Sequence, residues 1–268
     1  MAVVGIPILI FSEYIVYASL LALLALFALY EMFKVVGIEK YLIITIPPYL
    51  MGVGFPIAAY FISRDNATKF ILIGVASLFA YLLYTYFVAV FMKGKIKFEE
   101  ISQAFLLSCY VIFSFSSISA MRYLDESVGL WFVVLMLVCA WGCDVFAYFT
   151  GRFFGRHKLI PEISPKKTVE GSIGGIVCAG GLAMLLGLIV SLTTDLTPDY
   201  LVLALCGVVL SAVSQIGDLI ASLLKREHGV KDYGKIFPGH GGVMDRFDSI
   251  LSISTVLMAV CLVFPPFA

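Results

Sequence analysis

The chain has 268 residues, of which 61% are hydrophobic and only 13% are charged. Soluble domains carry about 25% charged residues, and the mean hydropathy of this chain is +1.03, so its composition excludes an ordinary soluble protein. The 18 basic and 18 acidic side chains balance each other, and we expect no nucleic-acid partner.

Eight apolar runs are long enough to cross a bilayer, which takes roughly 20 residues of α-helix. They cover residues 12–33, 41–62, 69–92, 100–120, 128–150, 172–193, 200–224 and 247–264. The predicted fold class is therefore all-α, a polytopic integral membrane protein with about 8–9 transmembrane helices. A ninth helix would have to use residues 1–11, which are apolar but too short to cross alone.

Basic residues concentrate on one side of this topology. If the eight spans alternate in direction, the loops at 34–40, 93–98, 151–171 and 225–246 share a side and hold 15 of the 18 Lys and Arg residues. Cytoplasmic loops of membrane proteins carry such an excess. We therefore expect this side to be cytoplasmic.

We take residues 1–121 as N-terminal transmembrane helices, and the part up to about Gly94 is chemically quiet. Glu31 is their notable charge, and we favour a structural role for it, through hydrogen bonds within the bundle, over contact with a lipid headgroup. Pro47 and Pro48 lie inside the second span. Because proline removes a backbone donor, we expect them to bend or break that helix.

Residues 122–268 hold most of the side chains that suggest chemistry, and we treat them as a catalytic transmembrane region with cytoplasmic loops 151–171 and 225–246. Asp144 lies within an apolar run. An ionisable residue there indicates a functional site, and the alternative is a hydrogen bond between helices. The next loop carries Ser164, Lys167 and Thr168, which could hold a phosphate or anchor the loop at the lipid headgroups.

A polar stripe marks the run that begins at residue 200. Its members are spaced by three or four residues, so in a helix they share one face. They are Ser211, Gln215, Asp218, Ser222 and Lys225. A carboxylate on such a face indicates a metal ion, a proton or a cationic partner.

A charged segment follows this stripe. Its cations suit phosphate groups, and they are Lys225, Arg226, Lys231 and Lys235. The turn Pro238-Gly239-His240-Gly241-Gly242 comes next. Its glycines lack Cβ atoms, so backbone N–H groups can approach an anion closely.

Asp245, Arg246 and Asp248 close the segment. Asp218 and Asp245 would offer hard oxygen ligands, which suit Mg²⁺ better than zinc. Acidic metal ligands, basic phosphate ligands and a glycine turn together indicate phosphoryl or nucleotidyl transfer.

The segment from Ser222 to Asp248, SLLKREHGVKDYGKIFPGHGGVMDRFD, resembles the signature of the phosphatidate cytidylyltransferases, the CDP-diacylglycerol synthases. Two earlier stretches are similar to the same family. Asp144, Ala147, Tyr148 and Gly151 fit its Asp-x-x-Ala-Tyr-x-x-Gly pattern, and residues 164–171 fit Ser-Pro-x-Lys-Thr-x-Glu-Gly. The specific resemblance covers residues 128–249, whereas the N-terminal third matches only as a hydrophobic bundle.

The resemblance implies a Mg²⁺-dependent nucleotidyltransferase, with a second cation left open, that condenses CTP with phosphatidic acid in phospholipid biosynthesis. Its catalytic residues would be Asp218, Lys225, Asp245 and Asp144. Its metal ligands would be Asp218, Asp245, Asp144 and Asp248. Its substrate and phosphate ligands would be Ser222, Arg226, Lys231, Gly239, His240, Gly241, Gly242, Arg246, Lys167, Thr168 and Ser164.

The same resemblance implies a homodimer. We expect it in the bacterial inner (plasma) membrane, with the active site facing the cytoplasm, where nucleotides are.

Two alternatives stay open on the sequence. One is a related CTP-dependent lipid enzyme, such as a polyprenol kinase or an ether-lipid cytidylyltransferase. The other is an ion-coupled transporter with Asp144 and Asp218 as coupling residues, which would leave the glycine turn unexplained.

Overall fold

The computed structural model describes residues 15–62, 65–93, 95–237, 239 and 241–268. In that part of the chain eight helical segments are long and apolar enough to cross a membrane, which confirms the all-α membrane fold and the eight predicted spans. They are Ile15–Val35, Leu42–Phe61, Ala67–Phe91, Phe98–Tyr123, Gly129–Phe154, Val169–Thr193, Tyr200–Glu227 and Met244–Val263. The suggested ninth span, residues 1–11, lies outside the described residues.

The chain divides into two compact units, Met1–Asp125 with Val230–Arg246, and Glu126–Gly229 with Phe247–Ala268. The functional division at residue 121, made from the sequence, stays a prediction.

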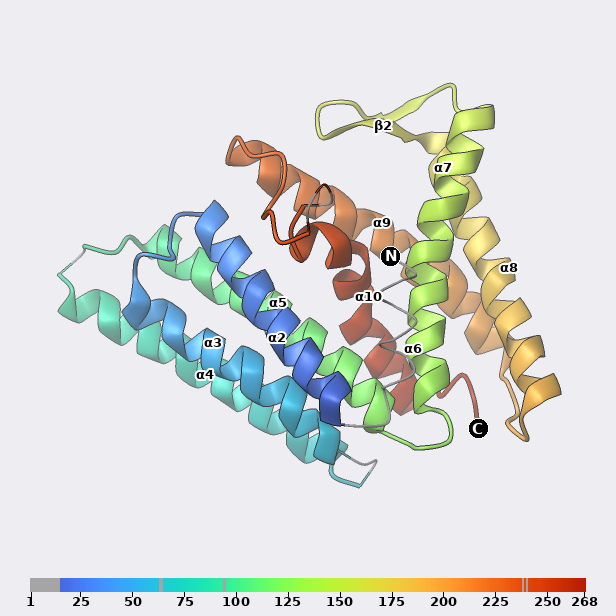
Figure 1. The fold of residues 1–268 in the computed structure, drawn as a ribbon, viewed down its shortest axis with the longest axis horizontal. Coiled ribbons are helices and arrows are strands. Elements are labelled where there is room, and N and C mark those ends of the chain that lie inside the picture. The colour runs from blue at the N-terminus through green and yellow to red at the C-terminus, as the bar shows by residue number, and fades with distance from the viewer. Residues whose placement is uncertain (1–14, 63–64, 94, 238, 240) are drawn as a thin grey trace. The chain divides into compact units, whose positions relative to one another are not determined.

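The first unit is a helical bundle (Figure 1). Its helices are α2 (Ile15–Val35), α3 (Leu42–Ala58) with the 3₁₀ turn η1 (Ala59–Phe61), α4 (Ala67–Phe91) and α5 (Phe98–Tyr123). α2, α3 and α5 pack against one another. Ala18, Ala25 and Ala28 of α2 are fully buried. Lipid offers no hydrophobic driving force for helix association, so close contact between helices matters, and small side chains permit it.

The proline-rich second span is not broken, because α3 runs through Pro47 and Pro48 as one helix. These prolines have no N–H groups for the carbonyls four residues earlier, those of Ile43 and Ile44. Tyrosines of α4 take their place: the Tyr84 hydroxyl donates to Ile43 O at 2.9 Å, and the Tyr81 hydroxyl donates to Ile44 O at 3.1 Å. Neighbouring helices thus satisfy the carbonyls that proline leaves without a donor.

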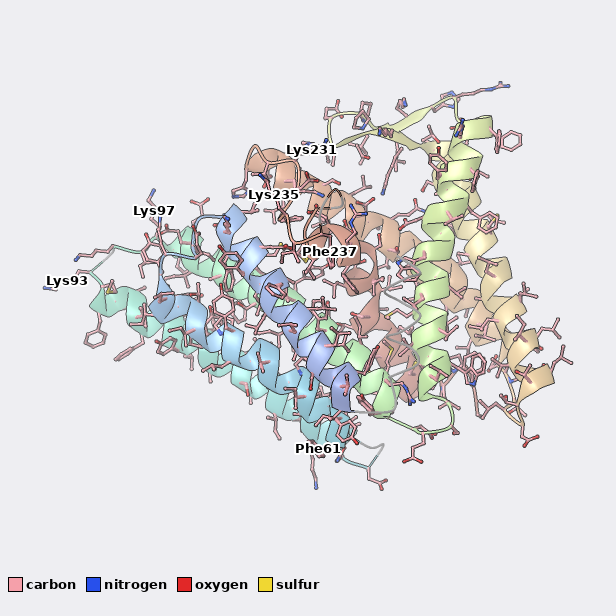
Figure 2. The ribbon with its side chains drawn as sticks, in the orientation of Figure 1. Phe61, Lys93, Lys97, Lys231, Lys235 and Phe237 are labelled. Carbon is pink, nitrogen blue, oxygen red and sulfur yellow. The ribbon has the colours of Figure 1, made fainter. Side chains whose placement is uncertain are left out.

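Lysines gather at one end of the first unit. Figure 2 shows Lys93, Lys97, Lys231 and Lys235 at the end opposite to Phe61. Lys93 and Lys97 thus lie at the same end of the first unit as Lys231 and Lys235 (Figure 2), as the charge pattern predicts. The cytoplasmic identity of that end stays a prediction.

The second unit contains α6 (Gly129–Leu137), the π-helical turn η2 (Val138–Gly142), α7 (Cys143–Phe154), α8 (Val169–Thr193), α9 (Tyr200–Glu227) and the part of α10 (Met244–Val263) that begins at Phe247. α8 packs between α7 and α9. Backbones come very close there, since a Cβ atom at Gly207 of α9 would lie 2.6 Å from Gly180 Cα of α8.

The predicted cytoplasmic loop 151–171 is shorter and more ordered than expected. α7 continues to Phe154, and α8 already begins at Val169. Between them, β1 (Lys158–Ile160) and β2 (Ser164–Thr168) form an antiparallel hairpin at the ends of α7 and α8 (Figure 1). The loop 225–246 is shorter too, because α9 extends to Glu227 and α10 begins at Met244.

Candidate active site

A π-helical turn precedes Asp144. The turn covers Val138–Gly142 in the middle of a membrane span, and such turns are frequent at functional sites because they redirect the side chains that follow. Ser211 of α9 donates its hydroxyl to the Cys139 carbonyl in this turn, at 3.1 Å. A side chain of α9 therefore supports the local geometry that sets the direction of Asp144.

Gln215 ties three helices together one turn before Asp218 on α9. It is buried, and its amide nitrogen donates to Cys143 Sγ of α7 at 3.0 Å and to the Ser172 carbonyl of α8 at 3.1 Å. The Ser172 hydroxyl donates back to Gln215 Oε1. The sequence placed Ser211 and Gln215 in the polar stripe but gave neither of them a role in the site. Their helical spacing with Asp218 was the available signal.

The carboxylates of the second unit lie together. Asp144, Asp218 and Asp248 are close enough to repel one another. Lys167 Nζ of the hairpin pairs with Asp218 Oδ2 at 2.5 Å, and the Ser249 hydroxyl donates to Asp144 Oδ2 at 3.4 Å. The structure thus brings together four residues that the sequence singled out from separate segments.

A cavity of about 410 Å³ opens beside this cluster within the second unit. Its lining is strongly cationic and includes Asp144, Tyr148, Arg152, Lys158, Lys166, Lys167, Thr168, Ser172 and Gln215. The Arg152 guanidinium donates to the Tyr148 hydroxyl at 3.0 Å. Four cationic side chains and one carboxylate line this cavity. Such an excess of positive charge suits a phosphate group better than an uncharged ligand.

Thr168, at the edge of this cavity, stabilises the start of α8. It is the N-cap of α8, and its hydroxyl accepts a hydrogen bond from Gly171 N at 3.1 Å. It also packs against Gly151 and Gly155 of the α7 end, where a Cβ atom would come within 2.7 Å and 2.8 Å of its Oγ1. Ser164 begins β2 and is not among the residues that line the cavity.

The glycine turn belongs to the first unit and is shaped by Asp245. Asp245 Oδ2 accepts hydrogen bonds from Tyr233 N at 2.8 Å and from Gly242 N at 2.9 Å. Gly239 and Gly241 have positive φ angles of 74° and 84°, a region that disfavours side chains with a Cβ atom. Pro238 and His240 lie outside the described residues.

Glu31 also reaches this turn, which the sequence did not indicate. Its Oε1 accepts from Val243 N at 3.0 Å, and its Oε2 accepts from Met244 N at 2.9 Å. The structural role that the sequence favoured for Glu31 is confirmed, and its partners are the residues where α10 begins.

The remaining predicted ligands are spread along the charged segment. Ser222 and Lys225 are half-buried near the end of α9, whereas Arg226 and Lys231 are exposed. Arg246 is half-buried, and its Nε has no hydrogen-bond partner among the described residues. Such a donor would be satisfied by a substrate phosphate.

The metal ligands stay a prediction. Within the described ranges, no three His, Cys, Asp or Glu side chains are arranged to hold one metal ion. The donor types still fit, since Mg²⁺ is commonly bound by one or two carboxylates together with substrate phosphates rather than by a complete protein cage.

A model described as the cytidylyltransferase family matches residues 1–264 of this chain. The chain belongs to the cytidylyltransferase family. Among its relatives is a protein of Bacillus subtilis (strain 168) named phosphatidate cytidylyltransferase, 39% identical over 204 residues, which are 76% of this chain and 72% of the relative. Proteins of the same name from Staphylococcus epidermidis (strain ATCC 12228 / FDA PCI 1200) and Staphylococcus aureus (strain COL) are 38% and 36% identical over 183 residues, 68% of this chain and 66% of each relative.

The capping role of Thr168 in this cytidylyltransferase can be tested by stability. Thr168→Ala removes the N-cap acceptor of α8, and we expect a loss of about 1 kcal/mol, whereas Thr168→Ser keeps the hydroxyl and should lose only a few tenths. The measurement is the thermal unfolding midpoint of purified protein in detergent. An alanine variant as stable as the wild type would remove the cap from the account.

Proposed function

We propose that this cytidylyltransferase condenses CTP with phosphatidic acid to give CDP-diacylglycerol and pyrophosphate. The observation that carries the proposal is the similarity to proteins named phosphatidate cytidylyltransferase, 36–39% identical. The cationic cavity beside three carboxylates, within a membrane protein, supports it. These relatives favour neither a polyprenol kinase nor a transporter.

In this reaction a phosphate oxygen of phosphatidate attacks the α-phosphorus of CTP. A new P–O–P bond forms as the bond from the α-phosphorus to the β-bridging oxygen breaks, and pyrophosphate takes the electron pair. The nucleophile needs no general base, because a phosphate monoester is already ionised near neutral pH. The problem for the protein is electrostatic, since an anion must approach a polyanion.

Cationic side chains of the second unit can reduce the repulsion between the two anionic substrates. Arg152, Lys158 and Lys166 line the cavity together with Lys167, and they can neutralise a substrate phosphate while it is positioned. Lys167 is held by Asp218, so its ammonium is already oriented when substrate enters. In the charged segment, Lys225, Arg226, Lys231 and Arg246 would bind further phosphate oxygens, and the glycine turn would pack against the triphosphate.

We also propose that the enzyme depends on Mg²⁺. Of the clustered carboxylates Asp144, Asp218 and Asp248 in the second unit, one or two would hold the ion together with substrate phosphates. Asp245 of the first unit stays a candidate ligand on family resemblance alone. A bound Mg²⁺ would supply positive charge that stabilises the phosphate oxygens during transfer.

Membrane placement follows from the same reasoning. Both substrates meet where a lipid headgroup borders the compartment that holds nucleotides, so we place the enzyme in the bacterial inner membrane with its site facing the cytoplasm. Diacylglycerol tails stay in the bilayer, which requires a lateral opening between helices. A homodimer is proposed on family resemblance alone.

Two labels on CTP test the reaction. With purified protein, Mg²⁺ and phosphatidic acid, label in the α-phosphate should appear in lipid, while label in the γ-phosphate should appear in pyrophosphate. A kinase acting on a polyprenol would instead transfer the γ-label to lipid. Intact CTP with both lipids would contradict the proposal.

Asp218 can be tested against a second aspartate of the same helix. Asp218→Asn removes a charge from the carboxylate cluster, and we expect turnover to fall at least about a thousandfold with the protein still folded. Asp199 caps the other end of α9 by accepting from Leu201 N and Val202 N, and Asp199→Asn should keep activity because asparagine caps equally well. Comparable activity of the two variants would exclude Asp218 from the reaction.

A further inference from the structure

Glu31 is a buried carboxylate that the reaction as described does not use. Its side chain is 2% exposed although it lies in the membrane-spanning helix α2. Burying a carboxylate is costly unless its oxygens accept hydrogen bonds. Here both oxygens do so, one from Val243 N and one from Met244 N.

Two glycines make room for this carboxylate. A Cβ atom at Gly234 or at Gly242 would overlap the Glu31 carboxyl group. Both glycines lie in the segment Val230–Arg246 that packs with α2 in the first unit. They have ordinary φ angles, so the space that Glu31 occupies, rather than backbone conformation, accounts for glycine at these positions.

The backbone of the turn is held from two directions. Glu31 takes the N–H groups of Val243 and Met244, and Asp245 takes those of Tyr233 and Gly242. The start of a helix normally attracts an anionic ligand through such N–H groups. Near the start of α10 the N–H groups of Gly242, Val243 and Met244, together with that of Tyr233, are engaged by the protein's own carboxylates, so they fix the turn instead of binding the substrate.

We propose that Glu31 is a positioning residue for cytidylyl transfer, which sets residues Gly242 to Met244, at the start of α10, in the conformation that receives the triphosphate of CTP. This inference rests on the proposed function. Glu31 acts through the backbone N–H groups of Val243 and Met244 and does not itself contact the substrate. Its loss should therefore weaken the use of CTP and leave the use of phosphatidate unchanged.

The isosteric change Glu31→Gln tests this directly. It replaces one acceptor oxygen with an NH₂ group that faces a backbone N–H, so one hydrogen bond becomes a donor–donor contact. We expect the KM for CTP to rise about tenfold or more, with the KM for phosphatidate unchanged. The matched control is Glu99→Gln, an exposed glutamate in the first turn of α5 of the same unit, which should behave like the wild type.

Hydrogen exchange gives a readout that does not depend on activity. In Glu31→Gln the amides of Val243 and Met244 should exchange faster than in wild type, while Glu99→Gln leaves them protected. Gly234→Ala should mimic this loss, since its Cβ displaces the carboxylate. On a Glu31→Ala background the same glycine change should cost little more, because the space is then empty.

The outcomes separate the two proposals. If wild-type protein forms no CDP-diacylglycerol, the proposed function fails, and exchange rates together with the glycine double-mutant comparison still decide whether Glu31 holds the turn. If the wild type is active and Glu31→Gln leaves the KM for CTP unchanged, or lowers only the amount of active enzyme, the positioning role is wrong. Strictly additive effects of Gly234→Ala and Glu31→Ala would also overturn it.

Discussion

The ion pair between Lys167 and Asp218 is the contact that links the β-hairpin of the second unit to α9 and to its carboxylate cluster. Asp218 lies on an apolar helix next to two further carboxylates, which repel its negative charge and make a nearby cation favourable. Lys167 reaches it from the β-hairpin at 2.5 Å. The pair neutralises part of the cluster and fixes where the hairpin lies over α9. Loss of either partner would leave the other charge without its counter-ion. It would also free the hairpin, which carries the cavity-lining residues Lys158, Lys166 and Lys167.

Glu31 and Asp245, two carboxylates of the first unit, are also compensated by partners, which here are backbone N–H groups and not a lysine. Glu31 and Asp245 each accept two backbone hydrogen bonds, and together they engage Tyr233, Gly242, Val243 and Met244. A carboxylate that accepts several N–H bonds is stabilised without a neighbouring cation. The glycine turn is thus shaped by acidic side chains although its expected ligand is an anion. Basic side chains of the charged segment must supply the attraction.

Much of the fold could be read from the sequence, because bilayer thickness imposes a length rule that the eight spans obey. The arrangement of the candidate active site was harder to predict from the sequence. Asp144, Lys167 and Asp218 come from three elements, and only the family resemblance placed them together, since periodicity acts within one helix. The hairpin was missed because Ser164–Thr168 shows no alternation of apolar and polar residues. Thr168 was read as a ligand, although a threonine before an apolar helix also signals an N-cap.

Glu31 shows most clearly what a local sequence pattern cannot predict, namely contacts with distant parts of the chain. A structural role through hydrogen bonds was expected, but its partners lie more than 200 residues later in the chain, and no local pattern links them. The prolines of α3 give a similar case. A proline pair predicts a disturbed helix, yet the two tyrosines that preserve the helix are on α4 and their register cannot be inferred from the proline positions. Tertiary contacts decide both outcomes.

We propose that the clustered carboxylates serve cytidylyl transfer by binding Mg²⁺. The most direct measurement follows CDP-diacylglycerol formation by purified protein in detergent, after EDTA treatment and then across a titration with Mg²⁺. We expect no product in EDTA, full recovery on adding Mg²⁺, and no recovery with a monovalent salt at equal ionic strength. Undiminished product formation in EDTA would contradict the metal-dependent mechanism, and the carboxylates would then need another explanation.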